Sequence, residues 1–315
     1  MRHANCWRVA RLRRHMQTVW ARLQDWALEK GIASEVKKAG LMADRIALGF
    51  GELAFLRSAT ANARYREAVL MLHGAAADNS SWVRFSHALG HGLPQLIPDL
   101  PGHGKSVAKP GMEYGIGVQA VRMAQFLAAQ GVERVHVIAS SMGGAIALRL
   151  AADQPQLVAS LMLIGAVGMQ ADESWLQRSI RDTGRNPMLT VRNKQDYEEM
   201  IRIGMAKPLA IAGFIVSALA RQYMRRLPIN EQIGRDINID LDQSAAAASI
   251  ACPALILWGR QDRVSDVSNA ALLHRTLRDS EVEILDDVGH VPMVEAPQRV
   301  AELCRRFLDR VAVPA

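Results

Sequence analysis

The sequence predicts an α/β fold in which helices flank a mostly parallel central sheet. Short apolar strand candidates alternate with helical segments along most of the 315 residues, a pattern typical of a parallel sheet covered on both faces. The alternation is interrupted over 169–249, where charged helical segments and three prolines occur without a buried strand. We therefore expect an N-terminal amphipathic helix and linker over 1–40, a core over 41–168 and 250–315, and an inserted helical cap over 169–249.

The N-terminal segment predicts an amphipathic basic helix. When residues 8–28 are projected at 100° per residue, seven apolar side chains fall within an arc of about 120°, and arginines occupy the flanks and the far side. The seven are Val9, Leu12, Met16, Val19, Trp20, Leu23 and Trp26. Such a helix is typical of an interfacial anchor that lies in the plane of the lipid headgroups. The alternative is a helix that packs on its own domain or on a second copy in a homodimer.

This helix lacks the run of about 18 apolar residues that spanning a bilayer requires. We expect a linker to follow it, near Gly31 to Gly40. The net charge of +7 is concentrated in the same segment, because six arginines precede the first acidic residue, Asp25. A local basic segment favours a membrane surface or an acidic partner, and we expect no nucleic acid partner.

Three cysteines, Cys6, Cys252 and Cys304, are too widely spaced to indicate a disulfide framework or a metal site. Free thiols and a positive N-terminal segment together favour a peripheral location on the cytoplasmic face of a membrane. A soluble cytoplasmic protein is the alternative.

The core elements follow one another as short apolar runs bounded by turn residues, separated by helical segments. Strands are expected at 45–48, 53–56, 68–72, 95–98, 135–138, 157–164, 252–259 and 281–285. Helices are expected at about 80–89, 117–130, after 141, 267–277 and 296–311. Because the later strands are parallel, their carboxyl ends meet at one edge of the sheet, where we look for functional side chains.

The stretch 135–148 is the most informative, because a strand runs into a serine turn and then into small residues that begin a helix. This pattern is typical of a nucleophile elbow, whose strained turn needs small residues two positions before and after the reactive serine. With Ser141 as the nucleophile those positions hold Ala139 and Gly143, whereas with Ser140 the earlier one would hold a large isoleucine. We therefore predict Ser141. The structural alternative is a polar turn before a glycine-rich helix.

A serine nucleophile needs a general base, and the base needs a group that orients it. Asp262 follows the strand that ends at Gly259, and His290 follows the final strand. Both lie at the carboxyl ends of predicted parallel strands, at the same edge as Ser141. Asp266 is the nearest alternative to Asp262.

The chain order Ser, Asp, His resembles that of the α/β-hydrolase superfamily. The resemblance rests on Ala-Ser-Ser-Met-Gly-Gly, Leu-Trp-Gly-Arg-Gln-Asp and Val-Gly-His-Val-Pro, and it extends from about Asp44 to the C-terminus. It implies a catalytic triad and an oxyanion hole made by two backbone N–H groups, with no cofactor and no metal ion. The residues implied are Ser141, Asp262 and His290 for the triad and Ala75 and Met142 for the oxyanion hole. His73 and His103 are expected to be structural.

The ending Val291–Pro297 looks like the lipase and esterase branch, and residues 257–267 are similar to membrane-associated monoacylglycerol lipases and related bacterial lipases and phospholipases A. The charged amphipathic helix departs from the hydrophobic anchor of such relatives. The resemblance implies a serine carboxylester hydrolase that acts on acyl glycerolipids, monoacylglycerols or (lyso)phospholipids, at a membrane surface. A soluble esterase for small esters and a non-catalytic ligand-binding or partner-binding member of the fold are the alternatives.

The cap contains an uncharged stretch, 208–220, which is too short to span a membrane. We expect it to line an acyl-chain pocket or to touch lipid. A helix buried against the core is the alternative.

Overall fold

The computed structural model describes residues 2–58, 66–90 and 92–311, with side chains described from residue 18 onward. The described residues form an eight-stranded sheet in the order β1-β2-β4-β3-β5-β6-β7-β8. Strand β2 pairs antiparallel with β1 and with β4, and all the other pairs are parallel. The strands are β1 (Leu41–Leu48), β2 (Gly51–Ser58), β3 (Glu67–Leu72), β4 (Gln95–Pro98), β5 (Arg134–Ser140), β6 (Val158–Ile164), β7 (Ala254–Gly259) and β8 (Ser280–Leu285). The predicted mostly parallel sheet is confirmed.

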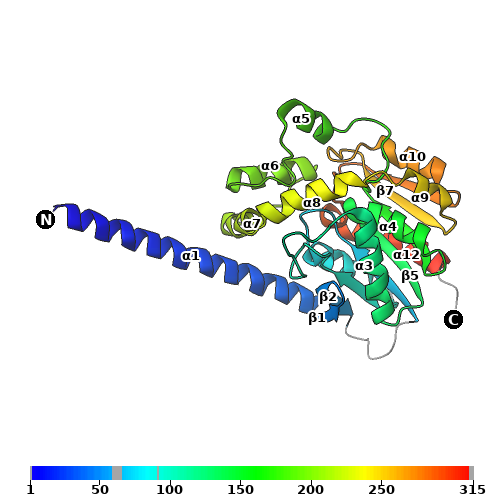
Figure 1. Ribbon diagram of the computed structural model, residues 1–315, viewed down its shortest axis with the longest axis horizontal. Helices are drawn as coiled ribbons and strands as arrows, with labels where there is room; N and C mark the ends of the chain where they lie inside the picture. Colours follow the sequence, from blue (N-terminus) through cyan, green and yellow to red (C-terminus); the bar gives the residue numbers. More distant parts are fainter. Residues whose placement is uncertain (1, 59–65, 91, 312–315) are drawn as a thin grey trace.

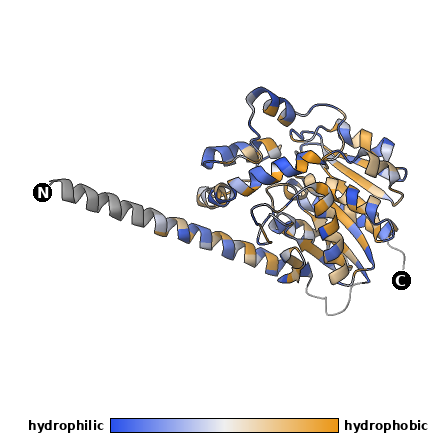
Figure 2. Ribbon diagram, viewed as in Figure 1, coloured by the Kyte–Doolittle hydropathy of each residue, from blue (hydrophilic) through white to orange (hydrophobic). Residues whose placement is uncertain are grey.

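Helices cover both faces of this sheet (Figure 1). Leu70 and Val137 pack under α3, α4 and α10, whereas their neighbours Met71 and Ile138 pack under α2 and α12. Successive strand residues point to opposite faces, and both faces of the central strands are covered. The central strands β3, β6 and β7 are therefore nearly continuous apolar runs, and much of the sheet is orange in Figure 2. These core helices are η1 (Asn79–Trp82), α2 (Val83–Leu89), α3 (Ile116–Ala129), α4 (Met142–Asp153), α10 (Ser268–Thr276), α11 (Pro292–Glu295) and α12 (Pro297–Val311).

Between β6 and β7 the chain forms helices and no described strand. They are α5 (Trp175–Thr183), α6 (Lys194–Gly204), α7 (Gly213–Arg225), α8 (Leu227–Ile239) and α9 (Ser244–Ser249). We call residues 169–249 the cap. Its helices α6 and α7 share a small apolar cluster that includes Tyr197, Met200 and Ala220. The cap therefore has its own apolar contacts in addition to those it makes with the core.

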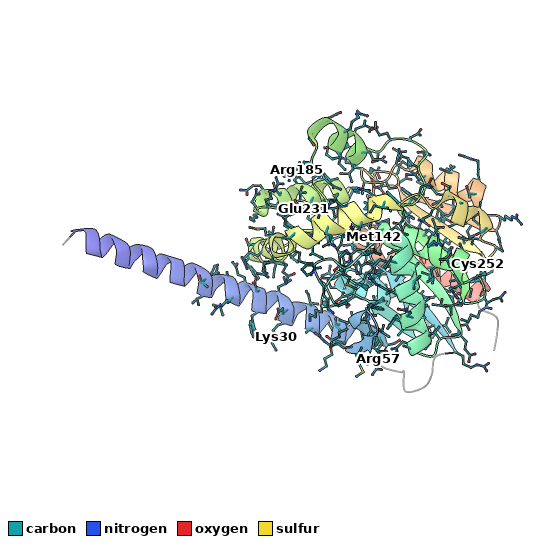
Figure 3. All side chains as sticks on the ribbon, viewed as in Figure 1. Lys30, Arg57, Met142, Arg185, Glu231 and Cys252 are labelled. Atoms are coloured by element: carbon teal, nitrogen blue, oxygen red, sulfur yellow. The ribbon has the colours of Figure 1, made fainter. Side chains whose placement is uncertain are left out.

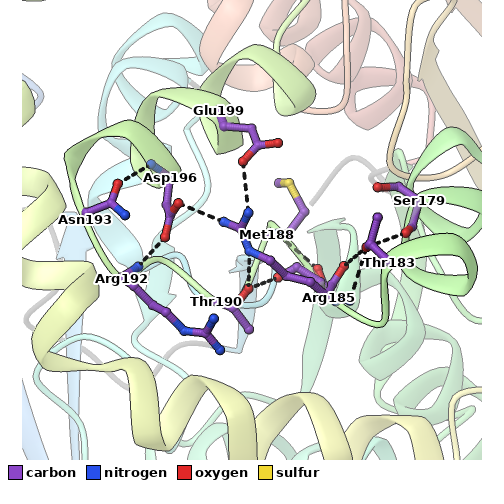
Figure 4. A network of polar contacts seen from close by, with 10 residues as sticks. Ser179, Thr183, Arg185, Met188, Thr190, Arg192, Asn193, Asp196 and Glu199 are labelled. Atoms are coloured by element: carbon purple, nitrogen blue, oxygen red, sulfur yellow. Dashed lines mark hydrogen bonds and ion pairs between the residues drawn. The ribbon is translucent and has the colours of Figure 1, made fainter.

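A polar network centred on Arg185 joins the segment after α5 to helix α6 (Figure 4). The guanidinium donates to Thr190 Oγ1 at 3.2 Å and to Glu199 Oε2 at 3.3 Å, and its Nη2 lies 3.1 Å from Asp196 Oδ1. Asn193 caps α6 by accepting the backbone N–H of Asp196 at 2.9 Å. This network fixes the start of α6, the helix that carries Met200 toward the cavity described below.

The uncharged stretch 208–220 divides between a loop and a helix, because α7 begins only at Gly213. Ala218 and Ala220 are buried, whereas Phe214 is 45% exposed. None of these described residues lines the cavity, whose wall on this side comes from Met205 and Tyr223. The expectation that the stretch lines an acyl pocket is therefore wrong. Its buried side chains are small, and the longer side chains on either side of it form the wall.

Helix α1 (Arg2–Lys38) is one long helix that projects away from the globular body (Figure 1). We predicted a linker from Gly31 to Gly40, but the helix continues through Gly31 to Lys38, so the prediction is wrong for residues 31–38. A glycine in a helix interior costs about 1 kcal/mol relative to alanine. Tertiary packing on both sides of Gly31 offsets this cost, because Leu28 is buried and Val36 packs against the core. Gly40, with a φ of 69°, turns the chain into β1.

Among the described side chains of α1, those that contact the body lie on one side of the helix. Asp25 accepts a hydrogen bond from Arg221 Nη2 at 2.6 Å and lies 3.2 Å from Arg225 Nη1, and both arginines belong to α7. On the opposite side, four apolar side chains are 43 to 62% exposed, and we call them the apolar stripe: Val19, Trp20, Leu23 and Trp26. Packing on its own domain, one of the two alternatives for this face, is thus not observed for these four residues.

The remaining members of the predicted apolar face, Val9, Leu12 and Met16, lie outside the described side chains, as do Cys6 and the arginines before residue 18. Within the described part of the chain, no helix has both the length and the apolarity needed to cross a membrane.

Candidate active site

Ser141 lies at the sharp turn between β5 and α4, with a φ of 54° and a ψ of −122°. A positive φ is uncommon for a residue with a side chain and marks a strained backbone. The turn is close-packed, because a Cβ atom on Gly143 would lie 2.4 Å from the carbonyl oxygen of Leu72. Ala139, two residues before Ser141, is fully buried in the sheet. The strand, strained turn and helix predicted from the sequence are therefore present.

Asp262 and His290 lie in contact at the ends of β7 and β8. The Nδ1 atom of His290 is 2.8 Å from Oδ2 of Asp262, and the two side chains are 5% and 0% exposed. The other carboxylate oxygen of Asp262 accepts the backbone N–H groups of Val264 at 2.8 Å and Ser265 at 2.9 Å. The carboxylate is thus fixed on both sides, and Nε2 is the imidazole nitrogen not bonded to Asp262.

The alternative acid, Asp266, has a different partner. Its Oδ1 accepts the backbone N–H of Ser268 at 3.0 Å, at the start of α10. The structure therefore pairs His290 with Asp262 and places Asp266 at a helix terminus.

A cavity of about 680 Å³ lies between the core and the cap, and Ser141, Ala75, Met142 and His290 line its core side. Small-molecule sites typically occupy about 300 to 1,000 Å³. The cap contributes mainly apolar side chains, among them Leu176, Ile180, Met188, Leu189, Met200 and Ile201. The site thus combines a serine, an imidazole and an apolar chamber.

Two backbone N–H groups border this cavity where the sequence predicts an oxyanion hole. Met142, 1% exposed in the interior of the body (Figure 3), is the first residue of α4, a position whose N–H has no acceptor within the helix. Ala75 follows Gly74, where a Cβ atom would lie 3.4 Å from Ser141 Oγ. Both candidate donors therefore lie on segments adjacent to Ser141.

His73 and His103 are buried side chains beside this loop. Nδ1 of His73 lies 2.8 Å from the carbonyl oxygen of Gly74, and its Nε2 accepts the N–H of Leu100 at 3.0 Å. Burial lowers the pKa of His73 to about 4 and that of His103 well below its usual value. Both rings are neutral near pH 7, and His73 fixes the carbonyl that precedes Ala75, which agrees with a structural role.

Asp99 supports the same loop and has no assigned role in the sequence analysis. One carboxylate oxygen accepts the N–H of Asn79 at 2.8 Å, and the other accepts the N–H of Lys105 at 2.8 Å. The side chain connects the segment after Ala75 to the loop after β4. Burial, followed by the nearby charge of Asp78, raises the pKa of Asp99 to about 7.

This pKa predicts a dependence of stability on pH. Because the folded pKa lies above the ordinary value of 3.8, the stabilising contribution of the protonated form is complete below about pH 4 and is lost as the pH rises through 7. The free energy of unfolding should fall by about 1.4 kcal/mol per pH unit across this range, relative to Asp99→Asn. Urea unfolding of both proteins at pH 5, 6 and 7 measures the difference, and a constant difference would contradict the prediction.

The described residues include no cluster of three His, Cys, Asp or Glu side chains that could hold a metal ion.

Comparison with known proteins identifies the family. A family model described as alpha/beta hydrolase fold matches residues 67–297. The chain is 30% identical to Lipase 3 of Moraxella sp. (strain TA144), over 77% of this chain and 78% of that one. It is 28% identical to a monoacylglycerol lipase of Xenopus laevis, over 91% of this chain and 86% of that one. The crystal structure of a membrane phospholipase A superposes with a TM-score of 0.88 at 30% identity, with 100% of both chains covered. The chain therefore belongs to the α/β-hydrolase fold family, with lipases among its relatives.

Proposed function

We propose that this chain is a serine carboxylester hydrolase that acts on acyl glycerolipids, either monoacylglycerols or (lyso)phospholipids, at a membrane surface. One observation carries the proposal: the strained Ser141 and His290, whose imidazole is bonded to Asp262, border one largely apolar cavity. An acyl chain needs such a chamber, and ester hydrolysis needs a nucleophile, a base and an orienting acid at its wall.

The reaction proceeds in two halves. His290 takes the proton of Ser141 as the serine attacks the ester carbonyl, and the N–H groups of Ala75 and Met142 stabilise the oxyanion. His290 then protonates the leaving alcohol, leaving an acyl-enzyme. Water activated by His290 releases the fatty acid and restores the serine. Asp262 holds the imidazole in the tautomer that carries its proton on Nδ1.

The lipid substrate is supported by the cap and by the relatives. Apolar side chains of α5 and α6 line the cavity next to the catalytic edge. The relatives named above are a lipase, a monoacylglycerol lipase and a membrane phospholipase A. The membrane location is supported by the apolar stripe of α1, which is exposed on the side opposite the cap. We place it on the cytoplasmic face, as a peripheral protein.

The stripe leads to a prediction for membrane binding. Replacing Trp20 and Trp26 by glutamate should weaken binding to vesicles that contain anionic lipid by at least about 10-fold, because burial of one large apolar side chain contributes about 1.5 to 3 kcal/mol. Turnover of a soluble ester should not change. Val121→Glu, at an exposed apolar side chain on α3, is the matched control. If the double variant sediments with vesicles as well as the parent does, the stripe is not the membrane contact.

The chemical class is tested with a fluorophosphonate probe and a short p-nitrophenyl ester. A covalent adduct that peptide mapping assigns to Ser141, together with turnover of the ester, is the expected result. A protein that folds but forms no adduct and releases no p-nitrophenol would instead be a ligand-binding member of the fold.

A further inference from the structure

Glu295, the last residue of α11, accepts three backbone N–H groups from two separate segments. Its Oε1 accepts the N–H of Gly289 at 2.9 Å. Its Oε2 accepts the N–H groups of Ala206 at 2.8 Å and of Lys207 at 3.2 Å. The first segment ends in the catalytic histidine, and the second belongs to the cap. One carboxylate therefore bridges the core and the cap beside the cavity.

The two segments also touch directly. The backbone N–H of His290 donates to the carbonyl oxygen of Gly204 at 2.8 Å. A Cβ atom on Gly289 would lie 2.7 Å from the nitrogen of Ala206, so only glycine allows this approach. Gly204, Met205 and His290 all line the cavity. The position of the imidazole is consequently tied to the position of this part of the cavity wall.

We propose that Glu295 is a positioning residue for His290. It holds His290 in place because its carboxylate bonds Gly289, the residue before His290, and the cap segment Gly204–Lys207 at the same time. The proposal rests on the proposed function, in which His290 is the general base. It assigns Glu295 a second effect, because the same contacts hold the cap segment against the cavity. If the segment Gly204–Lys207 moved, both this part of the cavity wall and the imidazole of His290 would lose a contact that holds them in place.

The chemistry of the contacts favours a carboxylate at this position. Three donors converge on two oxygens, and an ionised carboxylate offers only acceptors. Burial raises the pKa of Glu295, and the hydrogen bonds from Lys207, Gly289 and Ala206 oppose that rise. A carboxamide has the same shape but one acceptor, and its NH₂ group would face an N–H of one segment. Glu295→Gln therefore disrupts one side of the bridge with little change in volume.

The test measures kcat and KM of Glu295→Gln with p-nitrophenyl acetate, a substrate too short to depend on the acyl chamber. Rates are counted per fluorophosphonate-reactive site, so that any unfolded protein does not contribute. A misplacement of a catalytic group by about 1 Å lowers the rate about 100-fold. We expect kcat to fall about 10- to 100-fold with KM unchanged within about twofold, and Glu295→Met, which lacks both acceptors, to show the same loss.

Asp287→Asn is the matched control. Asp287 joins the same two segments through an ion pair with Lys207 at 3.0 Å, but both side chains are about 70% exposed. An exposed ion pair contributes little, and asparagine tolerates the φ of 63° at this residue. Its kcat should therefore stay within about twofold of the parent value.

Three outcomes would overturn the positioning role: a parental kcat in the Glu295 variants, an equal loss in Asp287→Asn, or a change confined to KM. If the protein is not a serine hydrolase, the result is different, since the parent protein would then show no turnover of p-nitrophenyl acetate above that of Ser141→Ala. A protein that hydrolyses only short esters would still test the positioning role, because this assay uses a short ester.

Discussion

Ser141→Ala should lower ester turnover by at least about 10⁴-fold and abolish fluorophosphonate labelling, because the proposed mechanism forms the acyl-enzyme on the hydroxyl of Ser141. Ser140→Ala is the matched control at the adjacent position. Ser140 is buried, and its Oγ atom has no hydrogen-bond partner in the described part of the chain, so alanine removes no hydrogen bond there. Its turnover should stay within about threefold of the parent value.

Steady-state rates with a soluble p-nitrophenyl ester measure both variants. Only Ser141 has the positive φ of the elbow, since Ser140 is the last residue of β5. The opposite result, with Ser140→Ala inactive and Ser141→Ala active, would show that the assignment of the nucleophile is wrong.

Asp262→Asn should lower kcat by about 10⁴-fold while leaving KM and the fold largely unchanged. An asparagine amide at this position favours the imidazole tautomer with its proton on Nε2, which cannot take the serine proton. Asp266→Asn is the control, because Asp266 accepts the N–H of Ser268 at the start of α10, whereas His290 is bonded to Asp262. It should retain activity within about threefold, at the small stability cost of a weakened hydrogen bond. Equal losses in the two variants would argue against an orienting role for Asp262.

The elbow and the ends of the later strands were predictable because their signals are local. A strained serine needs small neighbours, and Ala139 and Gly143 occupy those positions in the sequence. Asp262 follows the buried apolar strand β7, and His290 follows β8, the strand that pairs with β7 in parallel. Parallel strands bring their carboxyl ends to one edge. These rules need no knowledge of how distant segments pack.

Asp99 and Glu295 were not predictable in the same way. Asp99 bonds a backbone N–H 20 residues away, and Glu295 bonds one 89 residues away. Backbone donors leave no pattern of residue types in the sequence, so the partner of such a carboxylate becomes visible only in the fold.

The end of α1 shows where a local signal misleads. Gly31 suggests the end of a helix, yet the burial of Leu28 and the packing of Val36 against the core extend the helix to Lys38. The apolar face of the same helix was predicted from its period, but its direction relative to the body depends on the ion pair between Asp25 and α7. A helical period identifies a face and leaves open what that face contacts.

The most direct test of the lipid substrate is a graded acyl series. It compares p-nitrophenyl esters from acetate to palmitate with a monoacylglycerol and a lysophospholipid presented in vesicles, using the parent protein and Ser141→Ala. Turnover of the glycerolipids that disappears in Ser141→Ala, with kcat/KM rising as the acyl chain lengthens, is the result expected of an apolar acyl chamber. Activity confined to short soluble esters would contradict a lipid substrate and would make the protein a general esterase.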